Sequence, residues 1–153
     1  MESRPFTFRL ERVRAVRERL EDQAKEHLAA SLTHRLSGQA MLRSATAELD
    51  GARANQVETF TGGVASGTDI QAAQAYLERT QRLREARALE LDRRDTEVAA
   101  RRDALAAAAR ERQVLERLKE RRREDHRRES ARLEGAALDE LALGVHRRAE
   151  QAA

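Results

Sequence analysis

The sequence has no cysteine, only one proline (Pro5) and few aromatic residues, which make up 3% of its 153 residues. Without cysteine there are no disulfides, no thiolate metal sites and no redox role for the side chains. With 37% charged residues and so few large side chains, a compact globular core is not expected. The apolar share of 40% leans on alanine, which favours helices but adds little buried area. Such a chain can bury only a thin seam between helices.

Long apolar runs are also missing. No stretch approaches the roughly 20 apolar residues of a membrane span, and the first residues lack the apolar core of a signal peptide. We therefore expect a cytoplasmic protein with no membrane insertion. The 30 basic and 27 acidic side chains leave a net charge of only +3. Because the two signs are interleaved, they are typical of solvated helix faces, and no nucleic acid is expected as a partner.

The glycines and the proline divide the chain. Three of the seven glycines stand within 62–67, and long alanine-rich, charged stretches without proline lie on both sides. Glycine is permissive where a chain must turn, whereas proline interrupts helices. The sequence therefore predicts an all-α fold, an antiparallel two-helix coiled-coil hairpin that forms a single domain. We expect a helix over about 5–59, a turn at 60–68, a helix over about 69–144 and a frayed tail at 145–153.

Apolar residues at heptad spacing predict the seam. In the first helix one set is Val13, Leu20, His27, His34 and Met41, and its companion set is Leu10, Arg17, Ala24, Ser31, Gly38 and Ala45. After Met41 the phase slips by one residue, to Leu42, Ala45, Leu49, Ala52 and Gln56. In the second helix the repeat comprises Ile70, Leu77, Arg84, Leu91, Val98, Leu105 and Arg112, and its companions Thr80, Arg87, Arg94 and Arg101 are polar. The hairpin should be helical but loosely zipped.

The second helix should begin at a capping box, because Ser66 and Asp69 have the required spacing. Pairing the two helices about the turn places residue 8 opposite residue 120. At 1.5 Å per residue, the second helix then extends roughly 30 Å past the first. We expect everything beyond Glu120 to be an overhang with no intramolecular partner.

No motif predicts chemistry. The glycine-rich turn resembles a phosphate-binding loop but lacks the lysine that should stand between Gly67 and Thr68. His27 and His34 lie on one face roughly 10 Å apart, too far to share a metal ion, and they are interpreted as polar seam residues that fix the register. A general acid or base needs a concave, partly dry setting, which a two-helix rod does not provide. We expect no catalytic residue, no cofactor and no metal.

Three features predict partner binding. Residues 117–128 carry seven basic and three acidic side chains, a net charge of +4 that suits a solvated face, docking on an acidic protein surface or docking on nucleic acid. The overhang carries an apolar stripe, for which the hairpin offers no covering helix. Its members are Ala137, Leu138, Leu141, Ala142 and Val145. Tyr76, near the hairpin turn, is either a docking anchor or packed on Phe60.

Several segments together resemble the flagellar export protein FliJ family, and the resemblance covers nearly the whole chain. They are Phe6-Thr-Phe-Arg-Leu-Glu-Arg-Val13, the break near residue 60, Tyr76-Leu77, Leu118-Lys-Glu-Arg-Arg-Arg-Glu and Leu138-Asp-Glu-Leu-Ala142. The resemblance implies a coiled-coil hairpin similar to the central stalk of rotary ATPases. It would enter the hexameric ring of the flagellar type III export ATPase, contact the membrane export gate and help to recycle export chaperones. It would act on the cytoplasmic face of the inner membrane at the flagellar base.

The resemblance also assigns contact residues. The gate contact carries over to Tyr76 and Leu77, with Thr80 in place of an expected larger aliphatic residue. The stalk reading assigns the ATPase ring contact to Leu10, Val13, Arg121, Arg122, Arg123, Leu138, Leu141 and Val145. Two alternatives stay open at this point: the homologous stalk of a virulence type III secretion system, and an arginine-rich coiled coil that binds nucleic acid or acts as a scaffold.

Overall fold

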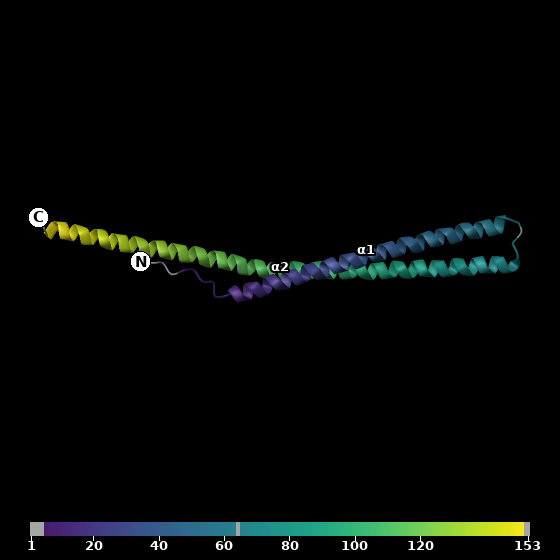
Figure 1. Cartoon of the computed structure of the whole chain (residues 1–153), viewed down its shortest axis with the longest axis horizontal. Helices are drawn as coiled ribbons and strands as arrows, with labels where there is room; N and C mark the ends of the chain where they lie inside the picture. Colours follow the sequence, from purple (N-terminus) through teal and green to yellow (C-terminus); the bar gives the residue numbers. More distant parts are fainter. Residues whose placement is uncertain (1–4, 64, 152–153) are drawn as a thin grey trace. The chain divides into compact units, whose positions relative to one another are not determined.

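The computed structural model describes residues 5–63 and 65–151, and within this part it contains two α-helices and no strand (Figure 1). Helix α1 spans Glu11–Thr61 and helix α2 spans Gly67–Gln151. The two helices pack against each other in opposite directions, which confirms the helical hairpin. Two expected boundaries were wrong: α1 begins six residues later than expected, and α2 continues to Gln151, into the segment that was expected to fray. The last two residues of that segment, 152–153, lie outside the described residues.

The late start of α1 has a local cause. Phe8 is buried, with 9% of its surface exposed, and its carbonyl accepts a hydrogen bond from the Glu11 N–H at 3.1 Å. The residues around Phe8 form a turn instead of a helix, and the helix begins after it with an acidic residue in its first turn. A negative charge there is favourable because it faces the positive end of the helix dipole.

The chain divides into two compact units. Unit 1 comprises residues 1–21 and 108–153, and unit 2 comprises residues 22–107. Each unit contains a part of α1 and a part of α2. The two units differ in the side chains that their helices bury.

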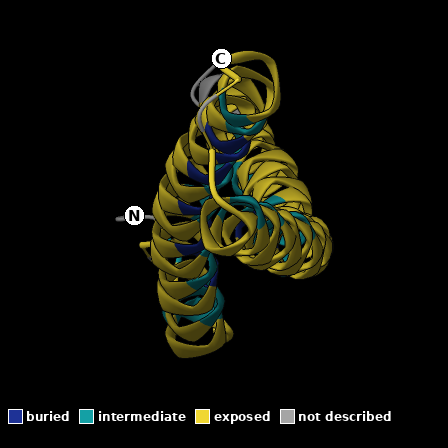
Figure 2. Cartoon of the chain, turned by 90° about the vertical axis from the view of Figure 1, so that its right-hand side faces the viewer, coloured by how far each residue is buried: buried dark blue, intermediate teal, exposed yellow. Residues whose placement is uncertain are grey.

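Unit 2 buries small and aliphatic side chains between its helices. Figure 2 marks the buried positions of the chain in dark blue. Small residues let two helices approach closely, and the aliphatic residues supply the area removed from water. The most buried side chains of this seam, each at most 5% exposed, are Ser31, Ala45, Leu49, Ala52, Thr80 and Val98.

The turn of unit 2 follows the sequence expectation. Gly63 has a φ of +69°, a conformation that favours glycine. At the start of α2 the Ser66 N–H donates to the Asp69 carboxylate at 2.9 Å, and the Asp69 N–H donates to Ser66 Oγ at 3.3 Å. These reciprocal hydrogen bonds confirm the capping box. The Ser66 hydroxyl also donates to the Asp69 carboxylate at 2.7 Å. This hydrogen bond, and next to it the one from the Ser66 N–H, lowers the pKa of Asp69.

The structure corrects the phase of the α1 seam. The residues turned toward α2 follow one unbroken heptad pattern, and there is no slip after Met41. One of its two sets is the predicted companion set. It begins at Arg17, repeats every seven residues to Ala45 and continues to Ala52. The other set lies one residue later than predicted and comprises Arg14, Glu21, Leu28, Arg35, Leu42, Leu49 and Gln56. The predicted set of Val13, Leu20, His27, His34 and Met41 is exposed instead. The two histidines therefore do not fix the seam register.

Charged residues take the place of apolar residues in this set because they find partners across the seam. Arg14 pairs with Glu116, Glu21 pairs with Arg112, and Arg35 pairs with Asp95. A charge at a half-buried position is tolerated when an opposite charge and hydrogen bonds compensate for the lost hydration. An analysis that counts only apolar residues therefore chooses the neighbouring, exposed positions.

A glycine makes room for one seam arginine in unit 2. Gly38 is buried, and a Cβ atom at this position would lie 3.0 Å from Cδ of Arg94. The Arg94 side chain passes over this site and donates from Nη1 to the carbonyl oxygen of His34 at 2.6 Å. Arg94, a member of the polar companion set that was expected to weaken the seam, is thus accommodated by Gly38 on α1.

Candidate partner-binding surfaces

In unit 1, ion pairs connect the α1 segment to the α2 segment. Between residues 11 and 21 of α1 and residues 111 and 119 of α2, four ion pairs cross the seam, and each α1 member lies near the level of its α2 partner. They are Glu11 with Lys119 (2.9 Å), Arg14 with Glu116 (2.8 Å), Arg17 with Glu111, and Glu21 with Arg112. The hydrogen bonds from Arg14 and from Lys119 lower the pKa of Glu11. Glu21 in turn raises the pKa of Arg112.

The ion pairs also fix the pairing level of the helices. Because Glu11 meets Lys119, residue 8 lies opposite a point on α2 about two residues beyond residue 120, the partner that was predicted for it. Phe6 then packs edge-on against the ring of His126, with the ring centroids 5.7 Å apart. The unpaired part of α2 therefore begins after His126, a few residues later than expected.

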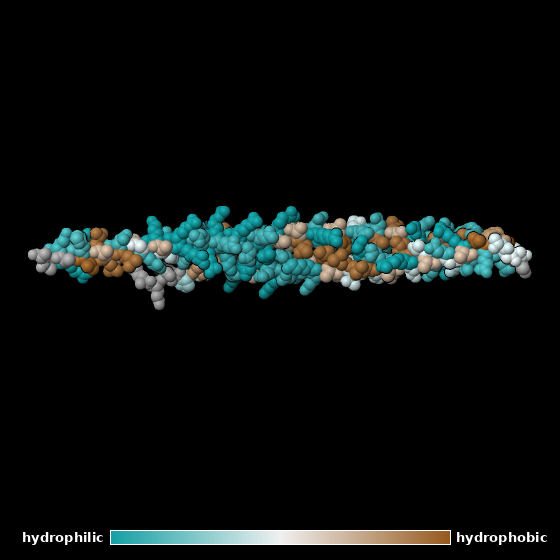
Figure 3. Space-filling view, turned by 90° about the horizontal axis from the view of Figure 1, so that it is seen from above, coloured by the Kyte–Doolittle hydropathy of each residue, from teal (hydrophilic) through white to brown (hydrophobic). Residues whose placement is uncertain are grey.

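Beyond His126 the remaining 25 helical residues of α2 extend for roughly 37 Å. Among the described residues, no hydrogen bond, ion pair or ring contact joins this part to α1. The predicted apolar stripe lies in this overhang and is open to solvent. Leu138, Leu141 and Val145 are 66%, 64% and 60% exposed, and Leu133, which sequence analysis left out, is 59% exposed. In Figure 3 apolar side chains gather near the C-terminal end of α2, next to a hydrophilic stretch of the same helix.

The basic cluster at residues 117–128 lies within that hydrophilic stretch. Some of its cations are satisfied within α2, because Arg127 and Arg128 both pair with Glu124. Arg121, Arg122 and Arg123 are exposed, and the described part of the chain offers them no ion pair within 4 Å. These three guanidinium groups are therefore available for an external acidic group.

The N-terminal members of the predicted ring contact are also accessible. Leu10 is 39% exposed and Val13 is 44% exposed. Both lie in unit 1, as do the three arginines and the overhang, so one unit carries all eight residues of this predicted contact.

The predicted gate residues lie in unit 2 and differ in accessibility. Tyr76 is 44% exposed, and Leu77 is half-buried. Phe60 is 57% exposed, and among the described rings no contact joins it to Tyr76. Thr80 is only 3% exposed, and its hydroxyl donates to the backbone carbonyls of Tyr76 and Leu77. Thr80 therefore belongs to the seam, and a partner can reach Tyr76 and the edge of Leu77.

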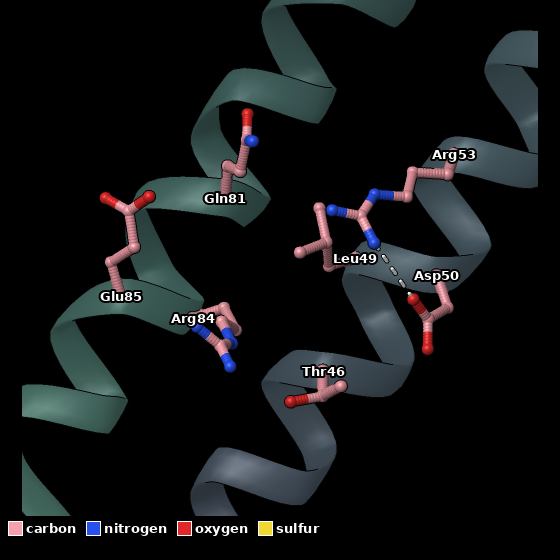
Figure 4. Close-up of a pocket in the computed structure, with 7 residues that line it drawn as sticks. All are labelled: Thr46, Leu49, Asp50, Arg53, Gln81, Arg84 and Glu85. Carbon is pink, nitrogen blue, oxygen red and sulfur yellow. Dashed lines mark hydrogen bonds and ion pairs between the residues drawn. The ribbon is translucent and has the colours of Figure 1, made fainter.

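One open groove lies between the helices of unit 2, with a cavity volume of about 310 Å³. Figure 4 shows its lining, in which Arg53 pairs with Asp50 on α1 while Arg84 points toward α1 from α2. The groove exists because the seam position of Arg84 holds a long, exposed cation instead of an apolar side chain. Apart from Leu49 and Thr46, its walls are exposed polar and charged side chains, which do not form the dry setting that acid and base catalysis needs.

The described residues contain no group of three or more histidine or acidic side chains arranged to hold a metal ion. None of their helices is long and apolar enough to cross a membrane.

Comparison with known proteins gives one match. The family model described as flagellar FliJ protein matches residues 6–151, almost the entire chain. No curated protein and no solved structure matches the chain significantly. The match covers both helices, the turn between them and the overhang. The chain therefore belongs to the flagellar FliJ family, and it is a coiled-coil protein related to flagellar type III export.

Proposed function

We propose that this chain is the central stalk of the flagellar export ATPase, and that unit 1 is the part that enters the ATPase ring. One observation carries the proposal: the overhang is a single helix that exposes an apolar stripe. Just before it on α2, Arg121, Arg122 and Arg123 are exposed and have no ion pair among the described residues. Large exposed apolar residues on an unpaired helix are costly in water and mark an interaction site. The family is one of export components, and a stalk has no need of its own active site.

The proposal assigns different work to the two units. The ring contact comprises Leu10 and Val13 on α1, the three arginines 121–123, and Leu138, Leu141 and Val145 on the overhang. The gate contact comprises Tyr76 and Leu77 in unit 2, while Thr80 holds the seam beneath them. Escort of export chaperones and attachment to the cytoplasmic face of the inner membrane belong to the same proposal. The chain itself is not an enzyme in this proposal.

Stimulation of the export ATPase tests the ring contact. The full chain should raise the hydrolysis rate of the purified hexamer, and the triple variant Leu138→Ser, Leu141→Ser, Val145→Ser should lose most of that effect. The matched control replaces Leu36, Leu89 and Val57 by serine, since these are 59%, 55% and 62% exposed but lie in unit 2. Equal stimulation by the two triple variants contradicts the proposal, as does ATP hydrolysis by this chain alone.

Binding to the membrane export gate tests the second contact. Tyr76→Ala should weaken gate binding by about tenfold, because truncation of an aromatic anchor commonly costs more than 1 kcal/mol. ATPase stimulation should stay near normal. If gate binding is unchanged, or if ATPase stimulation falls in parallel, the two contacts are not separate. A steep salt dependence of binding to nucleic acid would instead support the alternative class of function.

A further inference from the structure

The corrected seam leaves a second apolar surface in unit 1 that the hairpin does not use. Val13, Val16 and Leu20 occupy one side of α1 next to the seam and are 44%, 53% and 41% exposed. They are spaced by three and four residues, so they form one continuous strip along the helix.

Helix α2 adds to the same strip. In an antiparallel helix pair, the residue immediately before each a position of the heptad lies on the same side of the seam in both helices. On α1 these positions are Val13 and Leu20, and on α2 one of them is Leu118, which is half-buried. Val114, 63% exposed, extends the strip outward on α2. Apolar residues from two helices thus flank the same side of the seam, an arrangement that can accept a third helix.

The rim of this strip is basic. On α1 the neighbouring exposed residues are Arg9, Arg12 and Arg19, and on α2 they are Arg117, Arg121 and Arg122. None of these six arginines has an ion pair within 4 Å among the described residues. The adjacent carboxylate of Glu111 is already engaged by Arg17 across the seam. The strip is therefore apolar along its centre and cationic at both edges.

We propose that this strip is a docking site for an amphipathic helix of a partner protein, whose apolar stripe is flanked by aspartate or glutamate. Apolar contact at the centre would supply affinity, and charge complementarity at the rim would select the partner and its direction. A second copy of this chain would place one arginine rim against another, so like charges oppose that occupant. The proposal goes beyond the ATPase contact, with which it shares Val13 and the arginines at 121 and 122.

The test uses the full chain and two synthetic four-heptad peptides. Both peptides have leucine at the a and d positions; one has glutamate and the other lysine at the e and g positions, so each repels itself. Fluorescence anisotropy at about 0.1 M salt, where screening is still moderate, measures their binding. The glutamate peptide should bind, and the lysine peptide should not.

Two pairs of variants separate the strip from nonspecific binding. Val16→Ser with Leu20→Ser should weaken binding of the glutamate peptide at least about tenfold, the scale of an interface anchor. Leu36→Ser with Leu89→Ser, matched in exposure but in unit 2, should leave it unchanged. Arg12→Gln with Arg19→Gln should weaken it and flatten its salt dependence. Circular dichroism checks that helicity is kept in each variant.

Several results would overturn the docking site. These are equal binding of the two peptides, no binding of either, or equal losses in the strip and control variants. Dimerisation in sedimentation that depends on Val16 and Leu20 would instead identify a second copy as the occupant. Binding to anionic phospholipid vesicles with the same dependence would identify a membrane surface. If the peptide test fails while the chain still stimulates the export ATPase, this inference is wrong and the stalk proposal stands.

Discussion

The corrected seam can be tested by truncating two leucines that sequence analysis placed in the same kind of position. Leu49 is 5% exposed in the seam of unit 2, whereas Leu20 is 41% exposed beside the seam of unit 1. Removing a buried leucine side chain costs about 2–5 kcal/mol, because its transfer energy is lost and a cavity remains. The seam is thin and can partly collapse, so we expect Leu49→Ala to cost about 2 kcal/mol, at the low end of this range.

Leu20→Ala should be nearly neutral, within about 0.5 kcal/mol, because it removes no buried contact and alanine favours the helix. Urea unfolding followed by circular dichroism measures both. With a slope of about 2 kcal/mol/M, the midpoint should fall by about 1 M for Leu49→Ala and by less than about 0.3 M for Leu20→Ala. Equal shifts, or a larger shift for Leu20→Ala, would refute the corrected register.

Three further predictions concern the contacts that hold the hairpin. Arg84→Leu should raise the free energy of unfolding by about 1 kcal/mol, measured by the same urea assay, because it puts an apolar side chain into the open groove of the seam. An unchanged or lower midpoint would show that the groove is not a packing defect. Ser66→Ala should cost about 1 kcal/mol, because it removes the side-chain cap of α2; no loss of stability would contradict the capping role. Lowering the pH through about 4 should reduce the protection of residues 11–21 against hydrogen exchange, measured relative to the intrinsic exchange rate at each pH. The interactions with Arg14 and Lys119 that lower the pKa of Glu11 stabilise the fold while its carboxylate is charged, and this contribution disappears on protonation. Glu11→Gln should show part of this loss already at neutral pH, and identical exchange in the variant and the parent chain would contradict the role of Glu11.

The hairpin, the turn and the capping box could be predicted because they depend on local rules. Glycines at the turn, the absence of proline within the helices and the spacing of Ser66 and Asp69 each act over a few residues. The heptad set of α2 was also identified, since Ile70, Leu77 and Val98 are apolar and face α1.

The α1 seam could not be read in the same way, because its phase is set by residues far away in the sequence. Arg14 and Glu21 look like surface residues until Glu116 and Arg112 are known to face them. The signal was present as opposite charges at facing heptad positions, but it can be used only once the pairing level is known. Because apolar residues also lie beside the seam, the apolar pattern alone indicated the wrong heptad phase for α1.

For a related reason, the exposure of the candidate contact residues could be predicted only in part. The exposed stripe on the overhang followed from helix length alone, and its start shifted by only a few residues. Thr80 was placed in a partner contact on the basis of resemblance, but the structure buries it. Whether a heptad residue faces its own partner helix or an external protein depends on the pairing level of the hairpin.

The absence of natural cysteine allows a direct test of the central claim, since one introduced cysteine is a unique crosslinking site. Leu141→Cys and Val57→Cys are matched, because the two side chains are 64% and 62% exposed and lie in the overhang and in unit 2, respectively. Each variant is labelled with a short photocrosslinker and mixed with the assembled export ATPase hexamer. The stalk proposal predicts crosslinks from position 141 to residues that line the central channel of the ring, and none there from position 57. Crosslinks to the channel from position 57, or none from position 141, would contradict it.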